Sequence, residues 1–148
     1  MLNTLLRSAL PCIAIVLLLV AIAACDNMMS SLKPSKAHGL DLALYDFSSA
    51  MRWGDFDKAY DFVDPKTKVE HPLTDLERAR FKQVEVSGYT VISRLDGDGT
   101  VDEQVRLDLV NRNTQLTRSV IYREHWRWDP AIKTWWLVTG LPDISPQH

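Results

Sequence analysis

The sequence is poor in the residues that build metal centres and covalent cross-links. It has two cysteines, Cys12 and Cys25, and four histidines, no two of which have the spacing of zinc ligands. The chain also has no excess of basic residues, because 17 lysines and arginines face 19 acidic residues, for a formal net charge of −2. Phosphate binding needs a concentrated basic surface. We therefore expect no metal, no other cofactor and no nucleic-acid partner.

The first 24 residues have almost no charge. Arg7 is their only charged side chain, and residues 9–24 form one apolar run. A membrane-spanning helix needs roughly 20 apolar residues, so this run is short for one. A basic start, an apolar stretch and then small residues are typical of a secretory signal.

The run ends in Ile-Ala-Ala-Cys at residues 22–25, which resembles the bacterial lipobox. The resemblance implies a signal peptide over residues 1–24, cleavage between Ala24 and Cys25, and acyl chains on Cys25. Several acyl chains give firm membrane attachment, because each buried methylene contributes ~0.8 kcal/mol. Cys12 would leave with the signal, so no disulfide is expected. The alternative is an uncleaved N-terminal anchor.

The residues after Cys25 indicate where the protein is held. Asp26 resembles the inner-membrane retention signal of enteric bacteria, which favours the inner membrane over the outer one on the periplasmic side. The polar residues up to His38 include Pro34 and lack apolar periodicity. They predict a lipidated N-terminus and flexible tether over residues 25–38, roughly 20 Å long on average. The globular domain is then expected over residues 39–148.

Two helices are predicted at the start of this domain. Apolar residues recur at three- and four-residue spacing from Leu40 to Met51, which marks one buried helical face. Gly54 suits the left-handed position after a helix end. Asp55 is placed to cap a second helix whose apolar stripe reaches Val63.

A third helix is predicted after a loop. Asp64-Pro65 should stop the second helix, and the polar residues 66–72 are expected to be irregular. Thr74 and Glu77 form a capping box, which predicts a helix ending near Lys82.

From Val84 onward the apolar residues alternate, which predicts four strands joined by short turns in an antiparallel meander. The phase of alternation changes at Gly88, which indicates a bulge and a bent strand.

The acidic, glycine-rich residues 96–100 resemble the start of a calcium-binding EF-hand loop. Such a loop needs glycine at its sixth position and glutamate at its twelfth, and this sequence has neither there. Residues 96–100 are therefore expected to be a hairpin turn.

Helices followed by a bent meander resemble the cone-shaped nuclear-transport-factor-two-like superfamily. The resemblance covers residues 40–142 and rests on residues 54–59, the tryptophan-rich third strand, and the last strand with residues 140–142 behind it. It implies an α+β fold with three N-terminal helices packed on a curved four-stranded antiparallel sheet. Many members have a strand between the second and third helices, and residues 66–72 show no pattern for one.

The resemblance also implies a pocket within the cone. Isomerase and dehydratase members use an acid or a His-Asp pair there, and no motif in this sequence matches theirs. By position, the pocket residues are expected to be Asp57, Tyr60, Tyr89, Tyr122 and Trp126. The simpler interpretation is that the aromatic residues belong to the core.

The other face of the sheet is the expected interface, because interface cores are enriched in aromatic residues and arginine. Strand alternation places His125 opposite Trp126, where it could pair with a carboxylate such as Asp108. The interface residues are expected to be Arg106, Arg123, His125, Arg127 and Trp135. Stacked arginine and tryptophan side chains that only close this face are an equal alternative.

These observations predict a lipid-anchored envelope protein that is not an enzyme. It would bind a protein partner, either a second copy or another envelope protein, or a small apolar ligand in the cone. The alternatives are a small isomerase- or dehydratase-like enzyme and a structural accessory of an envelope complex.

Overall fold

The computed structural model describes residues 35–145. The predicted signal, Cys25 and most of the tether lie outside this range. The elements run in the order α2 (Lys36–Trp53), α3 (Phe56–Asp61), α4 (Pro65–Glu70), α5 (Asp75–Lys82), β1 (Val84–Asp96), β2 (Thr100–Asn111), β3 (Thr117–Asp129) and β4 (Thr134–Leu137). Within this range, no helix is both long and apolar enough to cross a membrane.

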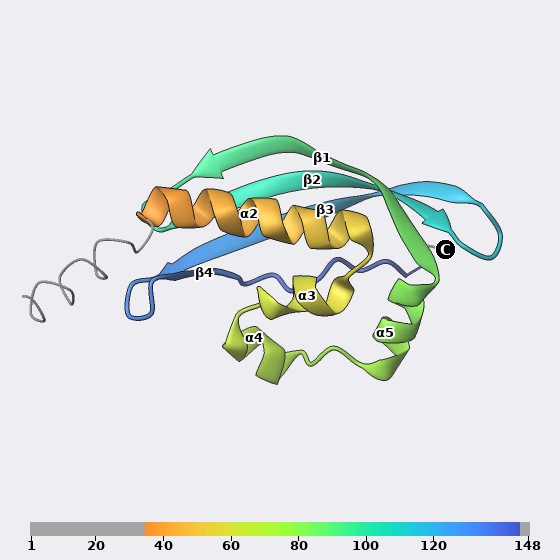
Figure 1. Cartoon of the computed structure of the whole chain (residues 1–148), viewed down its shortest axis with the longest axis horizontal. Coiled ribbons are helices and arrows are strands. Elements are labelled where there is room, and N and C mark those ends of the chain that lie inside the picture. The colour runs from red at the N-terminus through yellow and green to blue at the C-terminus, as the bar shows by residue number, and fades with distance from the viewer. Residues whose placement is uncertain (1–34, 146–148) are drawn as a thin grey trace, which may run out of the picture. The chain divides into compact units, whose positions relative to one another are not determined.

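The strands form one antiparallel sheet in the order β1-β2-β3-β4, as the alternation predicts. Figure 1 shows α2 lying lengthwise along the long strands, with α3, α4 and α5 on the same side of the sheet. The fold is therefore α+β, and the described helices cover one face only. The core between the layers is built from α2 and the covered face, with Phe47, Met51, Leu107 and Trp126 fully buried.

The first helix begins earlier than the sequence indicates. Lys36 and the two residues after it, expected in the tether, form the first turn of α2. The backbone oxygen of Lys36 accepts a hydrogen bond from Trp135 Nε1 at 2.9 Å, and its amine pairs with Asp98 at 3.0 Å. The two partners lie 62 and 99 residues away in the sequence, so local periodicity could not show these contacts.

The expected loop over residues 66–72 is wrong in part, because α4 occupies most of it and makes four helices in the described chain instead of three. Asp64 caps α4 by accepting from the Lys66 amide at 2.8 Å, and Pro65 occupies the first turn. Val63 also lies beyond α3, where it forms a parallel bridge with Leu137.

The bulge at Gly88 is confirmed, and a second register shift follows between Val91 and Ser93. A Cβ atom at Gly88 would lie 2.5 Å from Asp108 Oδ2, so any other residue at the bulge would require the Asp108 side chain to move. The capping box of Thr74 and Glu77 is present at the start of α5.

Candidate functional site

On the helix-covered face of the sheet, three of the predicted pocket residues lie near one carboxyl group that was not predicted. Glu124 is 1% exposed. Its Oε1 accepts from the Tyr89 hydroxyl, and its Oε2 accepts from Trp126 Nε1 at 2.9 Å. Tyr122, also buried, donates its hydroxyl to the backbone oxygen of Gly140 instead.

A second buried carboxyl lies beside the first. Glu103 on β2 is the cross-strand partner of Glu124 on β3, and its Oε1 lies 3.7 Å from Arg94 Nη1. Burial raises the pKa of Glu103 above its ordinary value. Burial also raises the pKa of Glu124 to about 7, although the hydrogen bonds from Tyr89 and Trp126 oppose the shift. Glu124 is therefore partly protonated near neutral pH.

The same environment acts on the tyrosines. Burial and the nearby Glu124 raise the pKa values of Tyr89 and Tyr122 above the ordinary range, so both hydroxyls stay protonated donors. The ring of Trp126 is fully buried and contacts Phe47 edge-on, with centroids 5.4 Å apart. Every buried side-chain nitrogen and oxygen in the described chain has a hydrogen-bond partner. These groups form one polar network, with Glu124 and Trp126 in the core and the partly buried Tyr89 at its edge.

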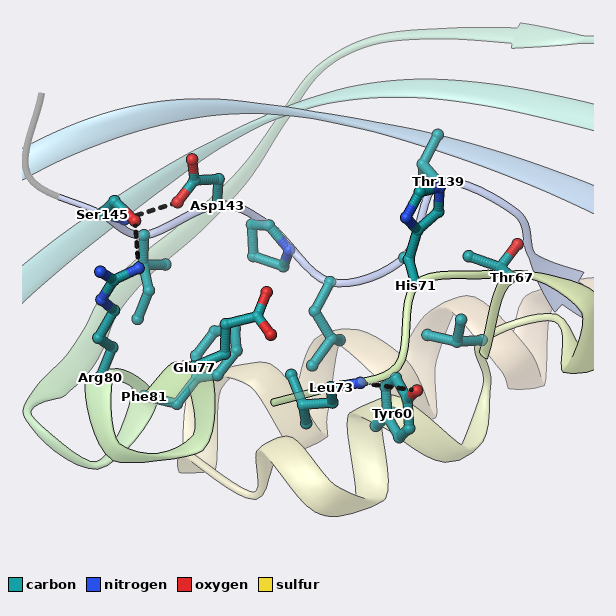
Figure 2. Close-up of a pocket in the computed structure, with 15 residues that line it drawn as sticks. Tyr60, Thr67, His71, Leu73, Glu77, Arg80, Phe81, Thr139, Asp143 and Ser145 are labelled. Atoms are coloured by element: carbon teal, nitrogen blue, oxygen red, sulfur yellow. Dashed lines mark hydrogen bonds between the residues drawn. The ribbon is translucent and has the colours of Figure 1, made fainter. Parts of the chain in front are cut away.

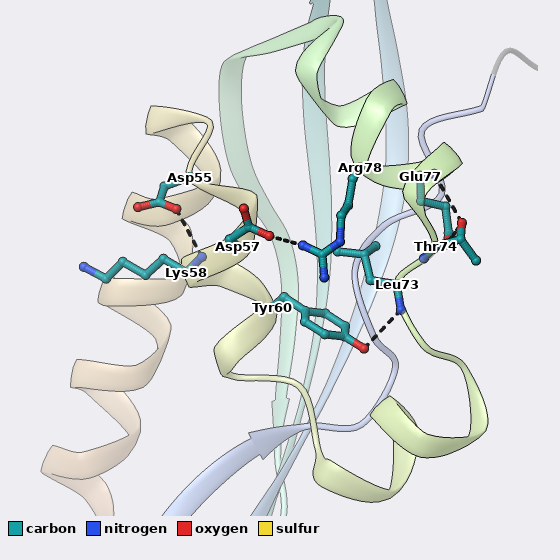
Figure 3. A network of polar contacts seen from close by, with 8 residues as sticks. All are labelled: Asp55, Asp57, Lys58, Tyr60, Leu73, Thr74, Glu77 and Arg78. Atoms are coloured by element: carbon teal, nitrogen blue, oxygen red, sulfur yellow. Dashed lines mark hydrogen bonds and ion pairs between the residues drawn. The ribbon is translucent and has the colours of Figure 1, made fainter.

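The other two predicted pocket residues lie elsewhere. Asp57 is exposed on α3 and pairs with Arg78 on α5, away from the sheet, as Figure 3 shows. Its assignment to a cone pocket is wrong, because its side chain is exposed and directed toward Arg78 of α5. Tyr60 accepts a hydrogen bond from the Leu73 amide at 3.2 Å and lines a different cavity.

That cavity, of about 300 Å³, lies between the helices α3, α4 and α5 and the segment after β4. We call residues 139–145 the C-terminal strap. Figure 2 shows the strap along one side of the cavity, with Tyr60, His71, Leu73 and Glu77 among the residues opposite.

The outer face of the sheet, which no described helix covers, carries most of the predicted interface. His125 Nδ1 lies 2.7 Å from Asp102 Oδ1 on the neighbouring strand. The expected partner Asp108 is wrong: it accepts from Ser119 Oγ at 2.6 Å and lies 3.7 Å from Arg106 Nε. Asp102 is directly opposite His125 in the register, whereas Asp108 is opposite Ser119.

Arg127 is held by an intramolecular ion pair. Its Nη2 donates to Asp64 Oδ2 at 2.7 Å, and that carboxylate is buried. Burial alone would raise the pKa of Asp64, but the hydrogen bonds from Arg127 and the Lys66 amide outweigh burial and lower it. Arg127 therefore fastens the start of α4 to β3.

Trp135 does not belong to the outer face, and its assignment to the interface is wrong. It is 4% exposed and packs against its cross-strand neighbour Trp128, with ring centroids 5.6 Å apart, on the covered face. Its indole Nε1 donates a hydrogen bond to the backbone oxygen of Lys36 in α2. Trp136, paired with Arg127, is the tryptophan on the outer face.

Two large apolar side chains complete the outer face. Leu95 is 71% exposed and lies opposite Asp102, and Ile121 is 55% exposed and lies opposite Arg106. Arg123 lies on the same face and forms no ion pair within residues 35–145. Arg123 is thus a cation without a salt bridge, two residues from Ile121 on β3 and separated from Leu95 by β2.

No protein-family model matches this sequence, and no curated protein matches it. Solved structures resemble this domain. One is the solution structure of a SEC-C motif-containing protein from Rhodopseudomonas palustris, 16% identical, covering 64% of this chain and 70% of that one with a TM-score of 0.51. Another is an NTF2-like protein from Burkholderia thailandensis, 13% identical, covering 66% of this chain and 83% of that one with a TM-score of 0.42. At 16% identity, the likeness to the SEC-C motif-containing protein is one of fold alone.

Sequence reasoning missed the two buried glutamates, although a signal for them exists. Glu124 lies two residues from both Tyr122 and Trp126, and Glu103 lies two residues from both Val101 and Val105. Strand alternation therefore puts both acids on the covered face. Glutamates are rarely buried without a partner, so this pattern predicts a hydrogen-bonding group among the nearby aromatic residues.

Proposed function

We propose that this chain is a lipid-anchored cell-envelope protein whose domain binds a protein partner through the outer face of its sheet. The observation that carries the proposal is the exposure of Leu95 and Ile121 on the one face that no described helix covers, which also carries Arg123, two residues from Ile121 on β3. Arginine and apolar side chains together are typical of the centres of protein interfaces.

The filled core favours the hypothesis of a protein partner over that of a small ligand in the cone. The space expected for such a ligand holds Trp126, Tyr122 and Glu124, all buried. An isomerase or dehydratase would need an acid that reaches its substrate, and both oxygens of Glu124 already accept hydrogen bonds from the protein. The proposed binding surface therefore lies on the outside of the domain.

The anchor is tested at Cys25. We expect the Cys25→Ser variant, expressed in a bacterium with its full signal, to lose metabolic incorporation of a labelled fatty acid. The thiol is the acceptor of the lipid, so no acyl chain can be attached at this position without it. Cys12→Ser is the matched control and should be labelled as before. Equal labelling of both variants would contradict the anchor.

The partner is tested at Ile121. We expect a photo-crosslinking residue at Ile121 in intact cells to give a discrete higher-mass adduct. With the photo-crosslinking residue moved to Leu95 on the same face, Ile121→Asp should weaken formation of this complex at least tenfold, about 1.4 kcal/mol, because the carboxylate would be buried against apolar groups. An adduct of twice the chain mass would identify a second copy, and another mass would identify a different envelope protein.

Val69 provides the control for that experiment. It is a β-branched residue on α4, 82% exposed and away from the sheet. Val69→Asp should leave the adduct unchanged, and a crosslinker at Val69 should give none of it. If both positions crosslink alike, or neither does, the outer face is not the binding surface.

A further inference from the structure

We infer that the cavity beneath the C-terminal strap is a binding site for a small organic cation with an apolar body, independent of the outer face. At about 300 Å³ it reaches the lower end of the range for small-molecule sites, roughly 300–1,000 Å³. It lies between helices and strap and includes none of the polar network around Glu124.

The wall formed by the strap is fixed in place by side chains from other elements. Tyr122 donates to the backbone oxygen of Gly140, and Arg118 donates to the backbone oxygens of Ile144 and Ser145, the latter at 2.8 Å. A wall held from outside the cavity is preorganised, so a ligand would not bear the cost of ordering it.

One part of the lining is apolar. Leu73 comes from the segment before α5, Phe81 from α5 and Leu141 from the strap. These side chains line one continuous cavity (Figure 2). They suit a short aliphatic or aromatic group, which would be stabilised by roughly 25 cal/mol for each Å² of apolar surface removed from water.

The charged part of the lining is acidic. Glu77 projects from α5 toward the strap, and Asp143 lies on the strap. Arg80 is the one lysine or arginine in the lining, so the formal charge of the lining, with histidine not counted, is −1. Hydrogen bonds from Thr74 lower the pKa of Glu77, and hydrogen bonds from Ser145 lower that of Asp143, so both are ionised at neutral pH.

Both carboxylates are exposed and neither forms an ion pair among residues 35–145, although Arg80 lies close enough to lower the pKa of both and Arg118 that of Asp143. Glu77 Oε2 bonds with the amide and hydroxyl of Thr74, which leaves Oε1 without a protein hydrogen bond. Arg80 donates to Ser145 Oγ at 2.9 Å and forms no ion pair with either acid. An ammonium group beside Glu77 Oε1, with its apolar body against Leu73 and Leu141, would satisfy this arrangement.

The test uses the full-length chain in detergent and two probes that share one body, 2-phenylethylammonium and 3-phenylpropionate. We expect ligand-observed NMR to show saturable binding of the ammonium probe, with a dissociation constant on the order of 1 mM for so small a molecule. The carboxylate probe should bind at least tenfold more weakly. No saturable binding of the ammonium probe, or equal binding of both probes, would overturn the inference.

Glu77→Gln should weaken the ammonium probe at least tenfold while keeping the fold, because glutamine still completes a capping box with Thr74. Asp143→Asn is the second variant and should act in the same direction. Glu85→Gln, an exposed site on β1, is the matched control and should not change affinity. Unchanged affinity in both Glu77→Gln and Asp143→Asn would overturn the role of the acids.

Discussion

Replacing Trp126 by alanine is expected to lower the free energy of unfolding of the domain by about 3–5 kcal/mol, the usual cost of removing a large buried aromatic side chain. The ring is fully buried and contacts Phe47 and Phe62 edge-on, at centroid distances of 5.4 and 6.2 Å. The substitution also removes the donor to Glu124 Oε2, which would leave a buried acceptor unpaired. Urea unfolding followed by far-UV circular dichroism measures the loss.

Two variants separate these contributions. Trp126→Phe keeps most of the packing but removes the indole donor, and it should cost about 1–3 kcal/mol. Trp53→Ala removes the same type of side chain where it is 84% exposed, and it should change stability by less than about 0.5 kcal/mol. If Trp126→Ala and Trp53→Ala had similar effects, Trp126 would not be at the centre of the core.

Features that depend on local pattern could be predicted from the sequence. The buried face of α2 follows from the spacing of Leu40, Ala43 and Phe47, and the glycine at its end has the expected positive φ of 71°. The capping box of α5 and the bulge at Gly88 rest on residues within a few positions of each other. Short-range sterics and hydrogen bonding decide these features wherever the rest of the chain lies.

Two predictions were wrong because the local sequence pattern fits two different structures. Asp64-Pro65 was interpreted only as a helix stop, although proline is also favoured in the first turn of a helix and aspartate at its cap. Strand alternation separates Trp135 from Trp136 but does not say which one faces the core. The hydrogen bond between Trp135 and Lys36, 99 residues apart in the chain, shows that Trp135 is the one on the covered face.

The candidate sites were harder to predict than the fold. The outer-face residues followed from alternation, and His125 does pair across strands, but with Asp102. The cavity under the strap joins residues from three helices and the end of the chain, so no sequence window contains its pattern. To predict that Glu103 and Glu124 are neighbours requires the strand register, which places them opposite each other.

The stability of the wild-type domain is expected to fall as pH rises, because of Glu124. Its pKa in the folded state is raised from an ordinary value of 4.5 to about 7, chiefly by burial. Folding therefore favours the protonated acid, so the favourable contribution is complete below about pH 4.5 and is lost as pH rises through 7. The full difference is roughly 3 kcal/mol, and roughly 2–3 kcal/mol of it should be lost between pH 5 and pH 8.5. The raised pKa of Glu103 acts in the same direction.

Glu124→Gln isolates this effect, because the amide can still accept from Trp126 and carries no charge at any pH. Relative to the wild type, the variant should gain roughly 2–3 kcal/mol in its free energy of unfolding between pH 5 and pH 8.5. Urea denaturation at both pH values measures the gain, and urea adds no ionic screening. Glu85→Gln, on an exposed part of β1, should show the same pH dependence as the wild type. If Glu124→Gln differed from the wild type by an equal amount at both pH values, Glu124 would be ionised throughout, and the burial of its carboxyl group would have to be compensated by stronger donors than Tyr89 and Trp126.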